Sequence, residues 1–291
     1  MKFGGSSVAN AANINKVISI VLESQKESDN LIVVVSAFGG ITNELIKLTT
    51  LASKENDEYK ILFNNLCERH NQVIKELIEI EDINQVMQEV NKKYNELGKI
   101  LKNIIAKELS PATLDAIVSF GEQLSAYIIS EAIKSRGIPC GFVDARSIIK
   151  TDDNFGEANV DIENSYKLIA KSVKNKGRLF VMGGFIASTH EGATTTLGRG
   201  GSDYTASLVG AALNASAVEI WTDVDGLMTA DPRKIKNAVT IPEISYEEAE
   251  KMALLGAKVI HPKTMKPAQL KNIPIYIKNT FNPKGNGTKI R

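Results

Sequence analysis

A continuous run of apolar residues, Leu31-Ile-Val-Val-Val35, constrains the fold more than any other feature of the chain. Most of its residues are β-branched, which favours an extended strand. No polar residue alternates with the apolar ones, so both faces of that strand must be covered. Gly39-Gly40 follows the run, and a helical pattern begins near Thr42. This order of strand, glycine turn and helix is typical of a parallel sheet flanked by helices.

The same order recurs along the chain. Residues 1–3 are predicted to end a strand that leads through Gly4-Gly5 into a helix, with apolar residues at helical spacing from Ile14 to Leu22. Further strands are predicted at residues 140–144, 178–182, 217–222 and 273–278. We therefore expect an α/β fold with a mainly parallel sheet, organised as two lobes of one compact unit.

Residues 54–109 differ from the rest, because they are rich in Glu, Lys and Asn, contain no proline and show few strand signals. They predict two or three amphipathic helices that form an excursion from the sheet, with their charges on a solvated face. Ser110-Pro111 predicts the start of the next helix, which should end near Gly137. Ser245 with Glu248 predicts a capping box.

The charge balance favours neither nucleic acid nor a membrane surface as a partner, since 35 basic and 34 acidic side chains give a net charge of +1. Two cysteines are too few for a disulfide framework, so we expect reduced thiols. No apolar run approaches the roughly 18 residues of a membrane span. The chain opens with a strand rather than a signal peptide, which predicts a cytoplasmic protein.

Four glycine-rich turns could hold an anion: Gly4-Gly5, Gly39-Gly40, Gly183-Gly184 and Gly198–Asp203. Glycine lets the backbone approach a ligand closely, and helix N-termini present free N–H groups to phosphates. Neither the Walker A spacing nor the dinucleotide fingerprint is present, so the phosphate site is of another kind. Asp223-x-Asp225-Gly226 lacks the ligand series of a calcium loop.

The three histidines have neither metal-ligand spacing nor a neighbouring Ser or Cys nucleophile, and we expect ordinary surface or core roles for them. Phosphoryl transfer to a carboxylate needs no general base, because a carboxylate with a pKa near ~4 is already an anion at neutral pH. That reaction needs positioning and positive charge around the phosphoryl oxygens. The sequence offers lysines and glycine-turn amides that can supply this positive charge.

Seven motifs in register resemble aspartate kinases of the amino acid kinase superfamily. They are Lys2-Phe-Gly-Gly-Ser-Ser-Val8, Val35-Ser-Ala-Phe-Gly-Gly-Ile-Thr-Asn43, Ser119-Phe-Gly-Glu-Gln123, Thr196-Leu-Gly-Arg-Gly-Gly-Ser-Asp-Tyr204, Trp221-Thr-Asp-Val-Asp-Gly226, Asp231-Pro-Arg233 and Gly256-Ala-Lys-Val-Ile-His-Pro262. The later motifs look most like the kinase part of bifunctional aspartate kinase–homoserine dehydrogenases. The resemblance implies a three-layer α/β/α, carbamate kinase-like fold. It also implies ATP- and Mg²⁺-dependent phosphorylation of the β-carboxylate of L-aspartate, the first step of lysine, threonine and methionine biosynthesis.

The resemblance assigns a group of residues to the amino acid substrate: Ser36, Thr42, Glu122, Phe185, Arg199 and Ser202. Glu122 would take the ammonium group, and Arg199 would bind the α-carboxylate with both arms of its planar guanidinium. Phe185 would form a wall of the pocket.

The resemblance also implies catalytic and nucleotide-binding residues. Lys2 would stabilise the transferred phosphoryl group, Asp203 would position Lys2 or the substrate amine, and Lys258 would reach the phosphates. The residues implied around the nucleotide are Lys2, Gly4, Gly5, Thr222, Asp223, Met228, Arg233 and Lys258. Met228 stands where many relatives place a tyrosine near the adenine. Trp221 is expected to be a core anchor rather than a stacking platform.

The family pattern implies an amino-acid-binding lobe at residues 1–200 and a nucleotide-binding lobe at 201–291, without the regulatory ACT domains through which relatives form homodimers. Two alternatives stay open at this point. One is a same-fold kinase for glutamate, N-acetylglutamate or a nucleoside monophosphate, and the other is a nucleotide-binding domain without turnover. Arg199-Gly-Gly-Ser-Asp203 together with Glu122 favours a free amino acid with both an ammonium and an α-carboxylate.

Overall fold

A computed structural model describes residues 1–291 except 29, 106–107, 174–178, 231–234, 236 and 256–259. The central sheet consists of β1 (Lys2–Phe3), β2 (Leu31–Val35), β3 (Gly141–Val143), β5 (Leu179–Gly183), β8 (Val218–Thr222), β9 (Glu243–Ile244), β10 (Ile275–Asn279) and β11 (Thr288–Ile290). Its order is β3-β5-β2-β1-β8-β10-β11-β9. Neighbouring strands run parallel in every pair except β10 and β11. The predicted mainly parallel sheet is confirmed.

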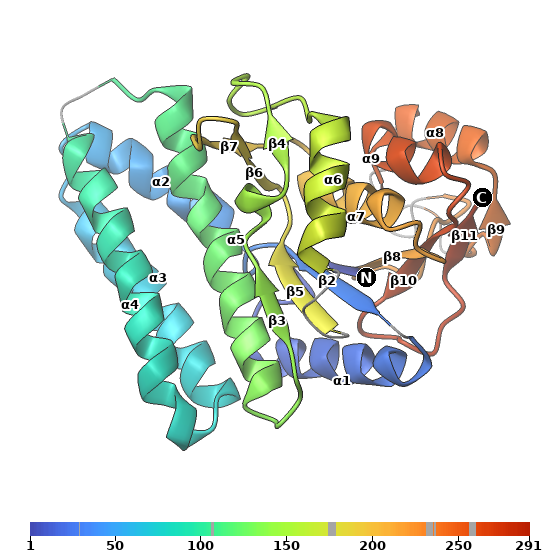
Figure 1. The fold of residues 1–291 in the computed structure, drawn as a ribbon, viewed down its shortest axis with the longest axis horizontal. Coiled ribbons are helices and arrows are strands. Elements are labelled where there is room, and N and C mark those ends of the chain that lie inside the picture. The colour runs from blue at the N-terminus through green and yellow to red at the C-terminus, as the bar shows by residue number, and fades with distance from the viewer. Residues whose placement is uncertain (29, 106–107, 174–178, 231–234, 236, 256–259) are drawn as a thin grey trace.

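Helices cover both faces of this sheet (Figure 1). They are α1 (Ala11–Glu27), α2 (Ile41–Ser53), α3 (Glu58–Leu77), α4 (Ile80–Asn103), α5 (Pro111–Lys134), α6 (Ile162–Val173), α7 (Gly201–Ala212), α8 (Tyr246–Leu254) and α9 (Pro262–Gln269). Val33 and Val35 of β2 pack in one core with residues of α1 to α5, whereas Val34 packs in a second core with residues of α6 to α9. This alternation along a strand buried on both faces produces the three layers.

The excursion predicted at residues 54–109 consists of α3 and α4, which pack beside α2 and α5 at the left of Figure 1. Ser110 caps α5 by accepting from the Thr113 N–H, and Ser245 with Glu248 forms the expected capping box of α8. Both predicted helix starts are confirmed. The division into lobes at residue 200 stays a prediction.

A small second sheet of β4 (Lys150–Thr151), β6 (Ile186–Thr189) and β7 (Thr194–Thr196) was not predicted, because strands this short carry no periodic signal. The buried carboxylate of Asp115, on α5, ties this sheet to the body. It accepts from the backbone N–H of Thr196 and of Gly156, each at 2.8 Å, and from the Thr196 hydroxyl at 2.8 Å. Asp115 is therefore one of the polar anchors of the second sheet, beside the bond that Arg146 donates to the Thr194 hydroxyl.

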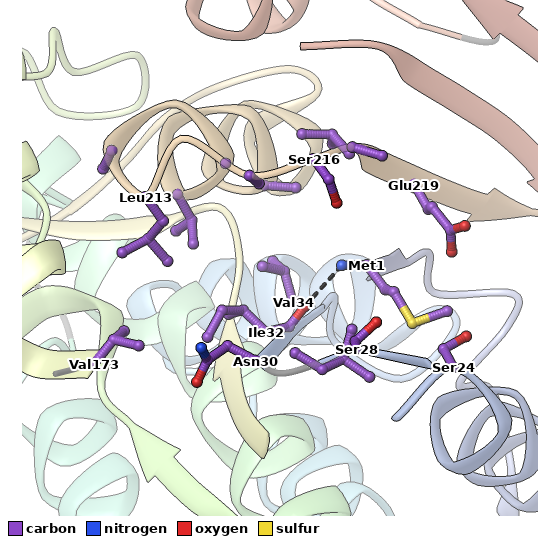
Figure 2. Close-up of a pocket in the computed structure, with 18 of the residues that line it drawn as sticks. Met1, Ser24, Ser28, Asn30, Ile32, Val34, Val173, Leu213, Ser216 and Glu219 are labelled. Carbon is purple, nitrogen blue, oxygen red and sulfur yellow. Dashed lines mark hydrogen bonds between the residues drawn. The ribbon is translucent and has the colours of Figure 1, made fainter. Parts of the chain in front are cut away.

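A cavity of about 760 Å³ lies at the amino-terminal ends of the central strands. The cavity lies beside Met1, Ile32 and Glu219 (Figure 2). The backbone nitrogen of Met1 donates to the carbonyl of Ile32 at 2.7 Å. This cavity is at the end of the sheet opposite to the glycine turns.

Within the described part of the chain, none of the helices combines the length and apolar character that crossing a membrane requires.

Replacing Asp115 with alanine should lower the free energy of unfolding by about 3 kcal/mol, because buried donors of Thr196 and Gly156 would lose a charged acceptor. Denaturant unfolding followed by circular dichroism measures this. The exposed Asp153→Ala is the matched control and should stay within about 0.5 kcal/mol of the parent. Equal stabilities of the two variants would contradict the anchoring role.

Candidate active site

The predicted glycine turns meet at the carboxyl ends of β1, β2 and β5, around a cavity of about 350 Å³ that we call the glycine-turn cavity. Ligands bind at this edge in open α/β sheets. Residues predicted from the sequence that line it are Lys2, Gly5, Ser36, Thr42, Glu122, Phe185, Ser202 and Asp203. The structure therefore brings together most of the residues assigned to the amino acid substrate and to the phosphoryl group.

Two helix N-termini border the cavity. Gly40, at φ +88°, precedes α2, and Gly200, at φ +72°, precedes α7. Both lie in the left-handed region, where glycine avoids the steric cost that a Cβ would bring. The first-turn N–H groups of a helix lack intrahelical acceptors and carry partial positive charge, so they attract anions. The cavity is suited to a ligand with negative charge.

Close backbone approaches shape the wall opposite β1. A Cβ on Gly184 would lie 2.7 Å from the Cα of Ser202, and one on Gly201 would lie 2.8 Å from the Cδ2 of Phe185. Phe185 itself has φ +65°, an uncommon conformation for a bulky residue. Its N–H donates to the hydroxyl of Thr205 at 3.1 Å, which helps to hold the strained residue in place. Strain of this kind clusters at functional sites.

Lys2 and Asp203 form an ion pair in the cavity, with 2.6 Å between Nζ and Oδ1. Their side chains are only 11% and 13% exposed, so the pair is weakly screened by solvent. Asp203 Oδ1 meets no donor of the described residues with hydrogen-bond geometry, so the contact is electrostatic. Asp203, on the first turn of α7, thus fixes the charged end of Lys2 inside the site.

Glu122, on α5, presents a buried carboxylate to the same cavity. Its Oε1 accepts from the backbone N–H of Ala37 at 3.2 Å, whereas Oε2 has no hydrogen-bond partner among the described residues. Burial raises the pKa of Glu122 to about 8. An unpaired buried carboxylate oxygen is costly, so this side chain is suited to a cationic ligand group.

Ser36 and Ser202 join the two sides of the cavity. The Ser36 hydroxyl, at the end of β2, donates to the Ser202 hydroxyl at 3.0 Å. The Ser36 carbonyl accepts from the hydroxyl of Ser125 on α5 at 2.7 Å. These hydroxyl groups belong to residues that line the same cavity as Glu122, where they can bind polar atoms of a small substrate.

The predicted carboxylate-binding residue Arg199 does not line this cavity. Its side chain is exposed, although Gly198 and Gly200 on either side of it line the cavity. Binding of a carboxylate by Arg199 stays a prediction that requires its side chain to turn inward.

Of the residues predicted around a nucleotide, Gly4, Gly5, Thr222 and Asp223 lie at the carboxyl ends of β1 and β8. The N–H of Gly4 donates to the Trp221 carbonyl at 3.2 Å, so in this structure it links the end of β1 to β8. Thr222 ends β8, and its hydroxyl donates to Asp223 Oδ1 at 3.2 Å. Met228 forms an isolated bridge with Thr240. Arg233 and Lys258 lie outside the described residues.

Trp221 is 3% exposed and stacks on Phe3 with 5.8 Å between ring centroids, which confirms its core role. Of the histidines, His70 is buried, His190 and His261 are exposed, and burial lowers the pKa of His70 to about 4. The described residues contain no group of three or more His, Cys, Asp or Glu that could hold a metal ion.

Several residues that shape the site were not predicted: Ala37, Phe38, Arg69, Asp115, Ser125 and Thr205. A pattern in the sequence of α5 could have indicated two of them, Asp115 and Ser125. Asp115, Ser119, Glu122 and Ser125 recur at helical spacing along α5, whose other residues are mostly apolar and buried. Such a polar stripe on a buried helix indicates directed polar contacts.

Comparison with known families gives one match over nearly the whole chain, since the profile described as "Amino acid kinase family" covers residues 1–279. Lysine-sensitive aspartokinase 3 of Escherichia coli is 38% identical over 292 residues, which are 99% of this chain and 63% of that protein. The bifunctional aspartokinase/homoserine dehydrogenase of Buchnera aphidicola is 37% identical over 296 residues, which are 100% of this chain and 36% of that protein. This chain thus spans about a third to two thirds of the length of these relatives.

Among solved structures, E. coli aspartokinase III in complex with aspartate and ADP is similar, with a TM-score of 0.90 at 36% identity. The match covers 99% of this chain and 63% of that one. The three-layer arrangement therefore agrees with an experimental structure over the described chain.

The stability of this chain should depend on pH through Glu122. Its pKa is about 8 in the folded state against 4.5 as a free side chain, so the folded state binds more protons between these values. The contribution of Glu122 to the free energy of unfolding should be fully present below pH 4.5 and be lost as the pH rises through 8, by at most about 1.4 kcal/mol per pH unit. Glu122→Gln should lack this contribution to the slope and be more stable than the parent at pH 8.

Denaturant unfolding at a series of pH values measures the difference between parent and variant. Glu163→Gln, at an exposed residue of α6, serves as the control and should keep the parental slope. If Glu122→Gln kept the slope as well, the proton would be held elsewhere.

Proposed function

The chain belongs to the amino acid kinase family, and from that premise we propose that it transfers the γ-phosphoryl group of ATP to the β-carboxylate of L-aspartate. The product is 4-phospho-L-aspartate. One observation carries the proposal: Glu122 offers an unpaired, buried carboxylate oxygen in the same cavity as the ammonium group of Lys2. The first suits the ammonium of an amino acid, and the second suits a phosphoryl group.

The chemistry is one of positioning and charge. The β-carboxylate of aspartate is an anion at neutral pH and attacks without a general base. Lys2, held by Asp203, and the N-termini of α2 and α7 stabilise the negative charge on the phosphoryl oxygens. Glu122 and the hydroxyls of Ser36 and Ser202 hold the amino acid in line with the phosphate.

ATP is proposed to bind beside the ends of β1 and β8, near Gly5, Thr222, Asp223 and Met228, with Arg233 and Lys258 as further phosphate contacts. Mg²⁺ fits this site as an ion carried by the nucleotide, because such ions are commonly held by phosphates and one or two carboxylates. The described residues offer no larger acidic cluster for it. When bound, the ion would neutralise charge on the phosphates.

Similarity supports aspartate as the substrate, because a 36% identical structure is of an aspartokinase with aspartate and ADP. We further propose that the whole protein acts at the start of lysine, threonine and methionine biosynthesis, in the cytoplasm. A homodimer through additional domains is part of the same proposal.

The function is tested by trapping the acyl phosphate with hydroxylamine, using ATP and Mg²⁺ with aspartate, glutamate or N-acetylglutamate. We expect a hydroxamate from aspartate alone, a loss of about 100-fold in Lys2→Ala, and parental activity in the exposed control Lys16→Ala. A signal from another acceptor would assign another substrate. The absence of any signal, with ATP still bound, would contradict the proposed activity.

Binding of aspartate should release a proton from the site. Near pH 7 Glu122 is largely protonated, because its pKa is about 8, and the arriving ammonium favours its charged form. Titration calorimetry in buffers of different ionisation enthalpy measures the number of protons, which should approach one at pH 7 and disappear in Glu122→Gln. Binding without proton release in the parent would place the ammonium away from Glu122.

A further inference from the structure

Arg69, on α3, reaches two of the glycine turns at once. Its Nη2 donates to the carbonyl of Gly39 at 2.6 Å and to the carbonyl of Ala9 at 3.1 Å. Its Nη1 donates to Oε1 of Glu44, on α2, at 3.2 Å. One guanidinium group therefore bridges the loop after β1, the loop after β2 and the first turn of α2.

These two loops touch through their backbones, which leaves no room for side chains to fix them. A Cβ on Gly39 would lie 3.0 Å from the carbonyl oxygen of Gly5 and 3.1 Å from the Cβ of Ala9. A Cβ on Gly5 would lie 3.2 Å from the carbonyl oxygen of Ala37. Glycine backbone is intrinsically permissive, so the shape of such a contact depends on the groups that hold its carbonyls.

The neighbouring residue of α3 makes a second contact with the same loop. The buried ring of His70 stacks on Phe38, with 5.0 Å between centroids and 21° between planes. His70 Nδ1 lies 2.8 Å from the carbonyl of Leu66 on its own helix, which fixes the ring. Phe38 lines the glycine-turn cavity. Adjacent residues of α3 thus hold the loop after β2 by a polar and an apolar contact.

We propose that Arg69 is a positioning residue, which locks the turns Gly4-Gly5 and Gly39-Gly40 against each other in the geometry that receives the phosphoryl group. This inference rests on the proposed function. Arg69 acts through the carbonyls of Ala9 and Gly39 rather than on the substrate, since it is absent from the lining of the cavity. The helical excursion is therefore part of the catalytic apparatus.

The expected effect falls on turnover more than on aspartate binding. Glu122, Ser202 and Asp203 stand on α5 and α7, and no contact of Arg69 involves them. Ser36 and Thr42 flank the turn that Arg69 holds, so the KM for aspartate should also rise, by a smaller factor than kcat falls. Misplacement of phosphate-binding turns by a fraction of an ångström should lower kcat by about 10- to 100-fold. Lysine presents a single point of charge and cannot span two carbonyls and a carboxylate in a fixed fork.

The test compares Arg69→Ala and Arg69→Lys with Arg146→Ala, in which the lost arginine pairs with Asp144 and lines no part of this cavity. Hydroxamate formation from aspartate gives kcat and KM. We expect a reduced kcat with a smaller change in the KM for aspartate in both Arg69 variants, partial rescue of Arg69→Ala by millimolar methylguanidinium, and parental values in Arg146→Ala. Unchanged kcat in Arg69→Ala, or a loss confined to the KM for aspartate, would overturn the proposal.

Hydrogen exchange read by mass spectrometry separates this proposal from the proposed function. Exchange in residues 4–10 and 36–42 should rise in Arg69→Ala, fall again with methylguanidinium and stay parental in Arg146→Ala. If the parent made no hydroxamate but both segments exchanged faster in Arg69→Ala, the role of Arg69 in holding the two turns would be supported. The proposed kinase activity would be contradicted. If exchange rose in neither segment, or in only one, the proposal that Arg69 holds the two turns against each other would be wrong.

Discussion

The pairing of β1 with both β2 and β8 decides where the chemistry of this chain can occur. Lys2 lies opposite Val34 on one side and Ile220 on the other, and both of these side chains belong to the core beneath α6 to α9. Because side chains alternate between the faces of a strand, Lys2 must point toward the layer that contains α7. Its ammonium group meets Asp203 there, at the carboxyl edge of the sheet.

The same register places Phe3 on the opposite face, packed against Trp221 and Val35 in the other core. A slip of one residue would exchange the two side chains, burying a charge among apolar residues and exposing an aromatic ring to the site. The buried aromatic pair and the ion pair therefore specify the same register from opposite faces.

The sequence was sufficient for six of the eight strands of the central sheet, because apolar and β-branched runs between glycine turns leave few other structures open, but it missed the short strands β9 and β11. It also singled out Lys2, Glu122, Ser202 and Asp203, which line one cavity, although their assignment came from resemblance more than from spacing. The second sheet was missed for a physical reason. Strands of two to four residues, such as β4 and β6, owe their existence to tertiary bonds like those of Asp115, and such bonds leave no local pattern.

The expectation that the charges of residues 54–109 form a solvated face was incomplete. Many of these side chains are exposed, but Arg69 turns toward the glycine turns and its side chain is only 32% exposed. Composition cannot distinguish this arginine from its charged neighbours, since its partners are backbone carbonyls distant in sequence. A charged residue whose partners are backbone carbonyls cannot be predicted from the sequence pattern, whereas the polar stripe of α5 can be recognised in it.

The stability of the chain and its proposed activity make opposite demands on Glu122. A well-packed apolar or amide side chain would suit the interior better than a carboxylate with one unpaired oxygen. The charge is tolerated because protonation relieves it in the empty site, at the expense of a pH-dependent stability. An ammonium group would supply the missing partner, so part of its binding free energy comes from removing a defect that the fold maintains. A ligand without a cation would leave that defect in place, so under the proposed function Glu122 would contribute to selectivity as well as to binding.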